Sequence, residues 1–428
     1  MKKILYLIVL LVFFTGCSVK RDESQDINTL TLWGGYSLVG DAEMELSQEE
    51  WVLNRLIRQY EQENTNIKIN YVYFEDENLI PQMLKGSIGS AEEPDMIVTL
   101  SGRYLENYEG MLLPLNDLLS QNLLNNMIGW ESVKDEHGQL MGVPAAGCDG
   151  TFIAYNKSLI DKAGLDFENN PPLSKDEFFE DLEILSEAGI IPIVVSDDGW
   201  NSLHSTIFGK WWLQQEDDDI FERLMANEVD FEKDLPFLDS FRLANECYEK
   251  GYINRDFVTN TDALTQFLNG QGAMYISSAF SSSLLEELGN DLGVIPIPDY
   301  SSNCNFQGMS LGGSSQCISV LRSTNLKEEC IHFLEWLFQK ENSIKMQKVY
   351  SGLPGRKDIT IENLGWEDKL IYQKLPFLNE TAKLYPELIL SPAQTEIYFV
   401  YGPQAISGNI SPEELATKMN SSVSNEKK

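Results

Sequence analysis

Histidine is scarce in this chain, and its scarcity narrows the chemistry that the chain can carry. Only His137, His204 and His332 occur in 428 residues, and they are widely separated. A zinc site usually takes several imidazole or thiolate ligands at short spacings, so a histidine-based metal site is not expected. The sequence also lacks a His-Glu-x-x-His motif, a phosphate-binding loop and a dinucleotide fingerprint. We therefore expect neither a metal nor a cofactor.

Closely spaced cysteines are missing as well. Six cysteines are present, and no two have the Cys-x-x-Cys spacing used in zinc and redox sites. When Cys17 is set aside for the reason given below, five remain, an odd number that cannot pair completely. Buried free thiols are the expected state, with a single disulfide left open. The five are Cys148, Cys247, Cys304, Cys317 and Cys330.

Basic residues are few relative to acidic ones. The chain has 32 Lys and Arg against 66 Asp and Glu, a formal net charge of −34. Such a surface repels nucleic acid and anionic lipid headgroups, so no nucleic-acid partner is expected. The same charge favours solubility, and we expect a monomer.

Long apolar runs are absent except at the N-terminus. Lys2 and Lys3 precede an apolar run from Ile4 to Phe14, which is too short to span a bilayer because a helix needs about 20 residues. The basic start, apolar core and small residues before Cys17 are typical of a signal peptide. A Thr15-Gly16-Cys17 end resembles a bacterial lipobox, whose cysteine is acylated and becomes the new N-terminus. We expect a lipoprotein on the outer face of the cytoplasmic membrane; the alternative is a secretory signal with a chance cysteine.

The remaining chain is organised as an α/β protein. About 410 residues follow Cys17, too many for one core, so two lobes are expected. Leu30 to Trp33 is strand-like, and Ser47 with Glu50 forms a capping box before a helical apolar pattern. Strands and helices alternate in this way along the chain. The alternation indicates a mainly parallel sheet flanked by helices in each lobe.

Several short motifs follow one another in a distinctive order. They are Pro94-Asp95-Met96-Ile97, Leu113-Pro114-Leu115, Gly142-Val143-Pro144, Tyr155-Asn156-Lys157, Ala163-Gly164-Leu165, Phe267-Leu268-Asn269-Gly270, Ile295-Pro296-Ile297-Pro298, Gly312-Gly313 and Leu353-Pro354. This ordered set, behind a lipobox, resembles the family 1 extracellular solute-binding proteins, the group that includes maltose-binding protein. The resemblance covers nearly the whole chain from about Leu30.

The resemblance implies a periplasmic-binding-protein-like fold, in which ligand is held in a cleft between two lobes and passed to the permease of an ABC importer. Three segments would cross between the lobes, near Gly147 to Gly150, Gly293 to Ile297 and Gln316 to Val320. The expected division is a signal peptide at 1–17, a tether at 18–28, a first lobe at 29–146 and 298–317, a second lobe at 147–297 and 318–420, and a disordered tail at 421–428.

Candidate ligand-binding residues lie in the loops that follow predicted strands. A sugar needs flat aromatic side chains for its apolar faces and carboxylates, amides or Arg for its hydroxyls. We expect stacking from Trp200, from Trp33 or Tyr36, and from Phe280, although Trp33 could equally be a core residue and Arg103 a surface residue. The full set is Trp33, Tyr36, Ser101, Arg103, Asp149, Trp200, Asn201, Phe280, Gly312, Gly313 and Arg356.

The sequence supports an enzymatic function less well than a solute receptor. Gly308 to Gly312 matches the Gly-x-Ser-x-Gly pattern, but that motif requires a following helix, and here a strand-like segment follows. A glycoside hydrolase needs only two carboxylates and stays open, as does a non-sugar solute such as a glycerol phosphate, polyamine or peptide. A phosphate ligand would need several cationic side chains to bind it, and the only candidates for that role are Arg103 and Arg356. We therefore expect a carbohydrate receptor without catalysis.

Overall fold

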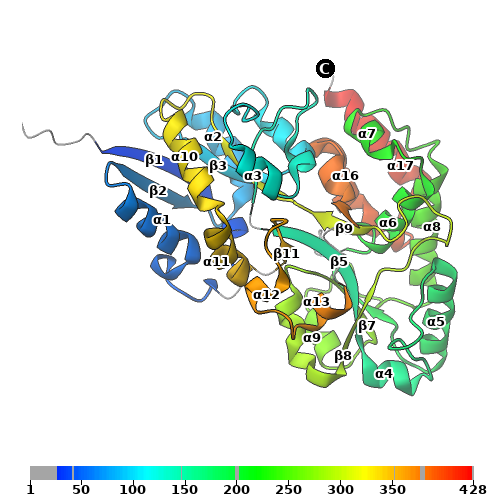
Figure 1. Cartoon of the computed structure of the whole chain (residues 1–428). Helices are drawn as coiled ribbons and strands as arrows, with labels where there is room; N and C mark the ends of the chain where they lie inside the picture. The colour runs from blue at the N-terminus through cyan, green and yellow to red at the C-terminus, as the bar shows by residue number, and fades with distance from the viewer. Residues whose placement is uncertain are drawn as a thin grey trace, which may run out of the picture.

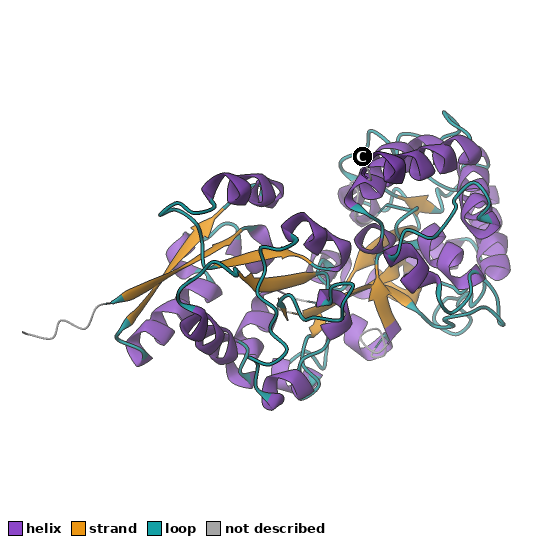
Figure 2. Ribbon diagram, turned by 90° about the horizontal axis from the view of Figure 1, so that it is seen from above, coloured by secondary structure: helices purple, strands orange, loops and turns teal. Residues whose placement is uncertain are grey.

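A computed structural model of the chain describes residues 27–40, 43–145, 147–197, 202–350, 352–375 and 381–426. The predicted lipidation site Cys17 and the candidate residues Trp200 and Asn201 lie outside the described residues. The chain forms two α/β lobes placed side by side, each with its own sheet and its own covering helices (Figures 1 and 2). The expected two-lobed α/β architecture is therefore confirmed.

The first lobe is built on a five-stranded sheet. Its strand order is β2 (Ile67–Tyr73), β1 (Asn28–Gly34), β3 (Met96–Leu100), β10 (Gln316–Val320) and β4 (Val143–Pro144). β1 is parallel to both β2 and β3, whereas β10 is antiparallel to β3 and β4. The helical segments of this lobe are η1 (Tyr36–Leu38), η3 (Gln48–Glu50), α1 (Val52–Glu63), η4 (Glu77–Leu79), α2 (Ile80–Ser87), η5 (Gly102–Tyr108), α3 (Gln121–Asn126), η6 (Trp130–Val133), α10 (Lys327–Leu337) and α11 (Lys340–Tyr350).

The second lobe is organised around one long strand. β5 (Gly147–Asn156) is buried along its whole length and pairs antiparallel with four strands, which are β7 (Met274–Ser278), β8 (Leu292–Pro296), β9 (Ser310–Gly313) and β11 (Leu353–Pro354). β6 (Ile193–Val194) and β12 (Ala382–Leu384) add parallel pairings at the two edges. Both sheets are therefore mixed, rather than mainly parallel as the strand–helix alternation suggested.

Helices cover the second sheet and carry most of its core. Trp211 and Trp212 are fully buried there, as is the apolar face of the helix that begins with the Ser174–Glu177 capping box. The helical segments are α4 (Lys157–Lys162), α5 (Lys175–Glu187), α6 (Ile207–Gln215), α7 (Ile220–Met225), α8 (Leu235–Glu249), α9 (Ala263–Leu268), η7 (Ser282–Asp291), α12 (Ile361–Leu364), α13 (Leu370–Lys374), α15 (Pro386–Ile389), α16 (Pro392–Ile406) and α17 (Pro412–Glu426).

The chain passes between the sheets at three places: from β4 to β5, from β9 to β10, and from α11 to β11. The first lies where the sequence suggests it. The segment Gly293 to Ile297 is not a crossing, because β8 pairs with β5 inside the second sheet. The crossing expected at Gln316 to Val320 lies just before that segment, between Gly313 and Gln316, because Gln316–Val320 is β10 of the first sheet. The crossing from α11 to β11 was not expected.

These pairings correct the expected lobe boundaries. Residues 318–350 were expected in the second lobe, but Ile318, Phe333 and Tyr350 are buried in the first core. The reason is that β10 inserts between β3 and β4, and α10 and α11 follow it onto that sheet. Conversely, the segment 298–313 belongs to the second lobe, where Met309 and Leu311 are buried.

The C-terminal segment also differs from expectation. Residues 421–426 were expected to be disordered, but α17 continues to Glu426. Its inner face is anchored by Leu415 and Met419, and the Asn420 side-chain amide donates to Asp230 at 2.7 Å. These contacts hold the helix on the second lobe up to Asn420, and the helix continues past the predicted boundary.

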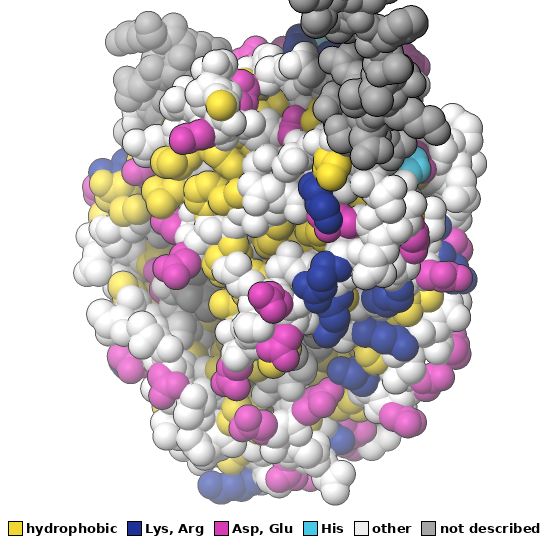
Figure 3. Space-filling view, turned by 90° about the vertical axis from the view of Figure 1, so that its left-hand side faces the viewer, with side chains coloured by type: hydrophobic (Ala, Val, Ile, Leu, Met, Phe, Trp, Pro, Cys, Tyr) yellow, Lys and Arg dark blue, Asp and Glu magenta, His cyan; other side chains and the backbone are white. Residues whose placement is uncertain are grey.

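Two further properties concern the described residues as a group. The five cysteines after Cys17 are free thiols, four buried and Cys304 partly exposed. None of the helices described is both long and apolar enough to cross a membrane. On the face shown in Figure 3, Asp and Glu side chains are scattered widely, whereas several Lys and Arg side chains gather in one group and others lie apart from it.

Candidate functional site

Asp149 lies at the lobe boundary, immediately after the first crossing. Its carboxylate oxygen Oδ1 accepts from the backbone N–H of Gly150 at 2.9 Å and from that of Phe280 at 3.3 Å. The other oxygen, Oδ2, accepts from the Tyr385 hydroxyl at 2.9 Å. Burial raises the pKa of Asp149, while the bonds from Tyr385 and Gly150 act in the opposite direction. Asp149 therefore ties β5 to β7 and to the segment after β12.

Two glycines complete this junction. β9 pairs with β5 so that Gly312 lies opposite Gly150 and Gly313 opposite Asp149. Gly312 has a φ of +142°, and a Cβ there would lie 2.6 Å from the Asp149 carbonyl oxygen. Any side chain at this position would push β9 off β5. The structure thus brings four of the predicted site residues together: Asp149, Phe280, Gly312 and Gly313.

Phe280 is half-buried beside the third crossing. Its ring lies so close to Gly352 that a Cβ on that glycine would be 2.6 Å from it. An aromatic ring supported by backbone on one side and partly open on the other can stack against a flat apolar surface.

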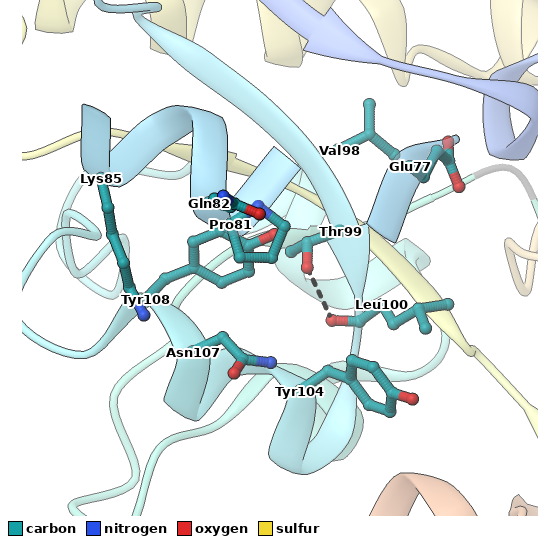
Figure 4. Close-up of a pocket in the computed structure, with 10 residues that line it drawn as sticks. All are labelled: Glu77, Pro81, Gln82, Lys85, Val98, Thr99, Leu100, Tyr104, Asn107 and Tyr108. Atoms are coloured by element: carbon teal, nitrogen blue, oxygen red, sulfur yellow. Dashed lines mark hydrogen bonds between the residues drawn. The ribbon is translucent and has the colours of Figure 1, made fainter. Parts of the chain in front are cut away.

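A cavity of about 420 Å³ lies in the first lobe, between α2, the end of β3 and η5 (Figure 4). Leu100 and Tyr104, which line it, also pack against the core of the second lobe, so the cavity lies next to the lobe boundary. The lining residues are Glu77, Pro81, Gln82, Lys85, Val98, Thr99, Leu100, Tyr104, Asn107 and Tyr108.

The lining of this cavity is mostly neutral and hydrogen-bonding. It combines two tyrosines with the amides of Gln82 and Asn107 and the hydroxyl of Thr99. Burial raises the pKa of Tyr108 to about 12, so its hydroxyl is protonated at neutral pH. Lys85 and Glu77 are the charged members of this described set. Aromatic rings next to neutral donors and acceptors suit a polyhydroxylated ligand.

Glu77 is held by a neighbouring loop. The Ser37 backbone N–H donates to Glu77 Oε1 at 3.0 Å, and the Ser37 hydroxyl donates to Oε2. Desolvation raises the pKa of Glu77, while these bonds from Ser37 oppose the shift. The loop after β1 and the loop after β2 are therefore joined at the cavity wall.

Other predicted site residues are engaged within the protein. Trp33 is a core residue of the first lobe, with its ring centroid 5.2 Å from that of Phe74. The Ser101 hydroxyl is buried and donates to the Ser314 carbonyl at 2.6 Å. Of Tyr36 the structure describes only the backbone, in η1.

The two predicted arginines also have internal partners. Arg356 donates to both carboxylate oxygens of Asp358, at 2.8 and 2.9 Å, and to the Phe338 carbonyl at 2.5 Å. Arg103 donates to Glu106, to the Leu224 carbonyl and to Asn227. Both side chains are buried, with 4% of Arg103 and 3% of Arg356 exposed, so neither guanidinium is presented to solvent as a free cation for an anionic ligand.

Sequence reasoning missed the residues that line the cavity. A helical spacing of three and four residues relates three of them, Tyr104, Asn107 and Tyr108, and such a spacing indicates a shared face. Tyr385 carried no such signal, because it reaches Asp149 only through the pairing of distant strands. Among the described residues, no group of three or more His, Cys, Asp or Glu side chains could hold a metal ion.

Comparisons with known proteins agree with this geometry. Residues 55–371 match the family described as bacterial extracellular solute-binding protein, and residues 1–18 match a prokaryotic membrane lipoprotein lipid attachment site. No curated protein sequence matches the chain significantly.

Solved structures share the fold over almost the whole chain. A chitin oligosaccharide binding protein is 20% identical, with a TM-score of 0.75, covering 94% of this chain and 99% of its own. The sugar-binding protein MalE from Xanthomonas citri is 17% identical, with a TM-score of 0.73 and coverages of 94% and 98%. A sugar transporter from Bacillus licheniformis in complex with stachyose is 20% identical, with a TM-score of 0.63 and coverages of 92% and 98%.

The family match spans more than half of the chain, and the lipid attachment site lies where the sequence placed the lipobox. That family is one of non-enzymatic solute receptors. The chain belongs to the bacterial extracellular solute-binding proteins and is a lipid-anchored receptor of ABC transport.

Proposed function

We propose that the solute is a carbohydrate, either a monosaccharide or an oligosaccharide, captured by closure of the two lobes and delivered to the permease subunits of an ABC importer. The observation that carries this proposal is the lining of the cavity at the end of β3. The ring of Tyr104 and the largely buried ring of Tyr108 line it, and Gln82, Asn107 and Thr99 offer neutral donors and acceptors. Sugar hydroxyls pair with such groups, and sugar C–H faces pack on aromatic rings.

The second lobe would supply the opposite wall. Phe280 is the proposed stacking ring there, and the Gly312-Gly313 backbone, which pairs with Gly150 and Asp149, is proposed to line the wall beside it. Trp200 and Asn201 remain proposed contacts on the same side. A ligand that touches both lobes stabilises the closed form by its differential affinity for that form.

A non-sugar solute is the alternative. A phosphate-bearing ligand would need several free cations, and both arginines that the sequence offered are engaged with internal partners. Among the described lining residues of the cavity, Lys85 supplies the positive charge. This balance favours a neutral ligand over an anionic one.

A thermal-shift screen of a variant without residues 1–17 tests the proposal. The probes are sugars, glycerol phosphates, polyamines and peptides. A ligand that binds only the folded state adds about 2.7 kcal/mol of stability at a hundredfold excess over its Kd. We expect a shift with one class of sugar, which is then recovered intact. A shift with phosphates, polyamines or peptides alone would contradict the proposal that the ligand is a sugar. Cleavage of the sugar would contradict the proposal that the protein is a receptor without catalysis.

A further inference from the structure

Arg103 connects the two lobes through its side chain. It lies on η5, whose Leu105 and Tyr108 are buried in the core of the first lobe. Its Nη1 donates to the Leu224 carbonyl at 3.2 Å and to Asn227 Oδ1 at 2.8 Å. Leu224 is part of α7, which belongs to the core of the second lobe. The guanidinium therefore bridges two bodies whose sheets are separate.

The charge on Arg103 is balanced within its own element. Nε and Nη2 donate to the two carboxylate oxygens of Glu106, at 2.6 and 3.0 Å, in a bidentate pair. Only 4% of the Arg103 side chain is exposed, compared with 47% of Glu106. A buried charge is tolerated when it is paired and hydrogen-bonded, and the Glu106 pair meets that condition. Because Nε and Nη2 are used by Glu106, Nη1 is the nitrogen that donates to the second lobe.

The partner in the second lobe is held in an unusual backbone conformation. Asn227 has a φ of +55°, in the left-handed region that asparagine tolerates better than most residues. It follows the C-terminus of α7, and its N–H returns to the Leu224 carbonyl at 3.1 Å. A cation is favourable at this end of a helix, because the free carbonyls there carry partial negative charge.

The surroundings of this contact also join the lobes. η5 packs on α15 of the second lobe, and a Cβ on Gly102 would lie 2.1 Å from the Leu388 carbonyl oxygen. Tyr104, two residues after Gly102, also packs against the core of the second lobe. The contact at Arg103 is thus the polar centre of a larger seal between η5 and the second lobe.

We propose that Arg103 and Asn227 form an interlobe latch, which stabilises, independently of ligand, the arrangement in which η5 touches the second lobe; this arrangement is called closed below. Arg103 is then a positioning residue for binding rather than a ligand contact. A hydrogen bond to a charged group contributes enough that its loss changes the closed-to-open ratio about tenfold or more. Because apparent affinity scales with the populated fraction of the binding-competent state, the latch would raise the affinity for any solute bound across the cleft.

Small-angle X-ray scattering of the ligand-free protein tests this without any knowledge of the solute. Asn227→Gly removes the side-chain amide and retains the positive φ, because glycine adopts it without strain. Arg103→Met removes the guanidinium and leaves Glu106, which is already half-exposed to water. We expect both variants to have a larger radius of gyration than the wild type. The double variant should be no larger than Arg103→Met alone, since Arg103→Met already removes the bond to Asn227 together with the bond to the Leu224 carbonyl.

Two further variants sharpen the test. Asn227→Asp places a carboxylate opposite Arg103, so the radius should equal or fall below that of the wild type, because charge-assisted bonds are stronger. Arg58→Met on α1 of the first lobe removes an exposed arginine and should change nothing. The latch is overturned if Asn227→Gly and Arg103→Met keep the wild-type radius, even with lowered melting temperatures. It is equally overturned if their effects on the radius add. Neither result bears on whether the solute is a sugar, which the thermal-shift screen decides.

Discussion

At the scale of single residues, the second lobe contains ionisable groups buried without charge. His204 is 1% exposed, and burial lowers its pKa to about 3. Its Nδ1 has no hydrogen-bond partner among the described residues, and its Nε2 lies 3.3 Å from the Ser202 hydroxyl. Glu387 is also fully buried, and desolvation raises the pKa of its carboxyl well above the usual value.

His204 should make the fold sensitive to acid. In the unfolded chain its pKa is about 6.5. As the pH falls below that value, His204 becomes protonated in the unfolded state but stays neutral in the folded state. Stability is therefore lost between pH 6.5 and about 3. From this residue we expect a loss of about 2 kcal/mol at pH 5 relative to pH 7. Urea unfolding of wild type and His204→Gln at both pH values measures the difference; an identical pH dependence in the two would refute the assignment.

Glu387 should act in the opposite direction. Because its pKa is raised, Glu387 keeps its proton in the folded state, whereas in the unfolded state it loses that proton above about pH 4.5. The stability of the fold therefore falls as the pH rises above about 4.5. Glu387→Gln keeps the shape and removes the ionisation. We expect this variant to gain stability relative to wild type at pH 8 and to gain less at pH 4. Melting curves at the two pH values measure this, and a gain that does not depend on pH would contradict a buried neutral acid.

At the scale of elements, η5 serves both the cavity and the lobe boundary. Tyr104, Asn107 and Tyr108 line the cavity, while Arg103 on the same turn faces the second lobe. A short helix can divide its side chains in this way because residues three and four apart share a face.

Asn107 is the polar centre of the cavity face of η5. Asn107→Ala should weaken binding of the sugar found in the screen about tenfold, as expected from the loss of about one to two hydrogen bonds to ligand. Calorimetric titration measures the change. Asn122→Ala, an exposed asparagine on α3, is the matched control and should bind as the wild type does. Equal affinity in Asn107→Ala and wild type would remove the cavity from the binding site.

The sequence predicts elements more reliably than it predicts their partners. The Ser174 capping box and the apolar face of α1 depend on neighbours within four residues, and both lie where the local pattern places them. β10 could not be assigned to its lobe in the same way, because its place between β3 and β4 depends on residues far away in the chain. The lobe boundaries were therefore wrong, although these locally determined elements lie where they were predicted.

The same reasoning explains the candidate site. Asp149 lies near the start of β5, Gly312 lies near the end of β9, and Phe280 comes just after β7. These strand ends meet in the second sheet, and strand ends gather ligand-binding groups. Arg103 and Arg356 also follow strands, but an arginine's partners depend on its tertiary neighbours, which a local pattern does not contain.

At the scale of the whole molecule, a strongly acidic two-lobed receptor is held outside the cell by lipid. The net charge of −34 gives the protein no general attraction to anionic headgroups, so retention at the membrane depends on the anchor. One acyl chain binds only marginally, whereas two or more hold a protein stably. Cys17 is therefore expected to decide where the protein is found.

Cys17→Ala tests the anchor. We expect the variant to leave the membrane fraction and appear in the soluble fraction, with its folded domain unchanged. Fractionation followed by immunoblotting measures the distribution, and the wild type serves as the control. Persistence of Cys17→Ala in the membrane fraction would mean that something other than the lipid holds the protein there.

The central claim is that this receptor binds an intact sugar at the lobe boundary. Its most direct test is calorimetric titration of the protein lacking residues 1–17 with maltose, stachyose and chitin oligosaccharides, followed by mass spectrometry of the recovered ligand. We expect saturable binding of at least one neutral sugar at one site per chain, with the sugar returned uncleaved. Absence of binding to neutral sugars, together with saturable binding of a phosphorylated or cationic solute, would contradict it.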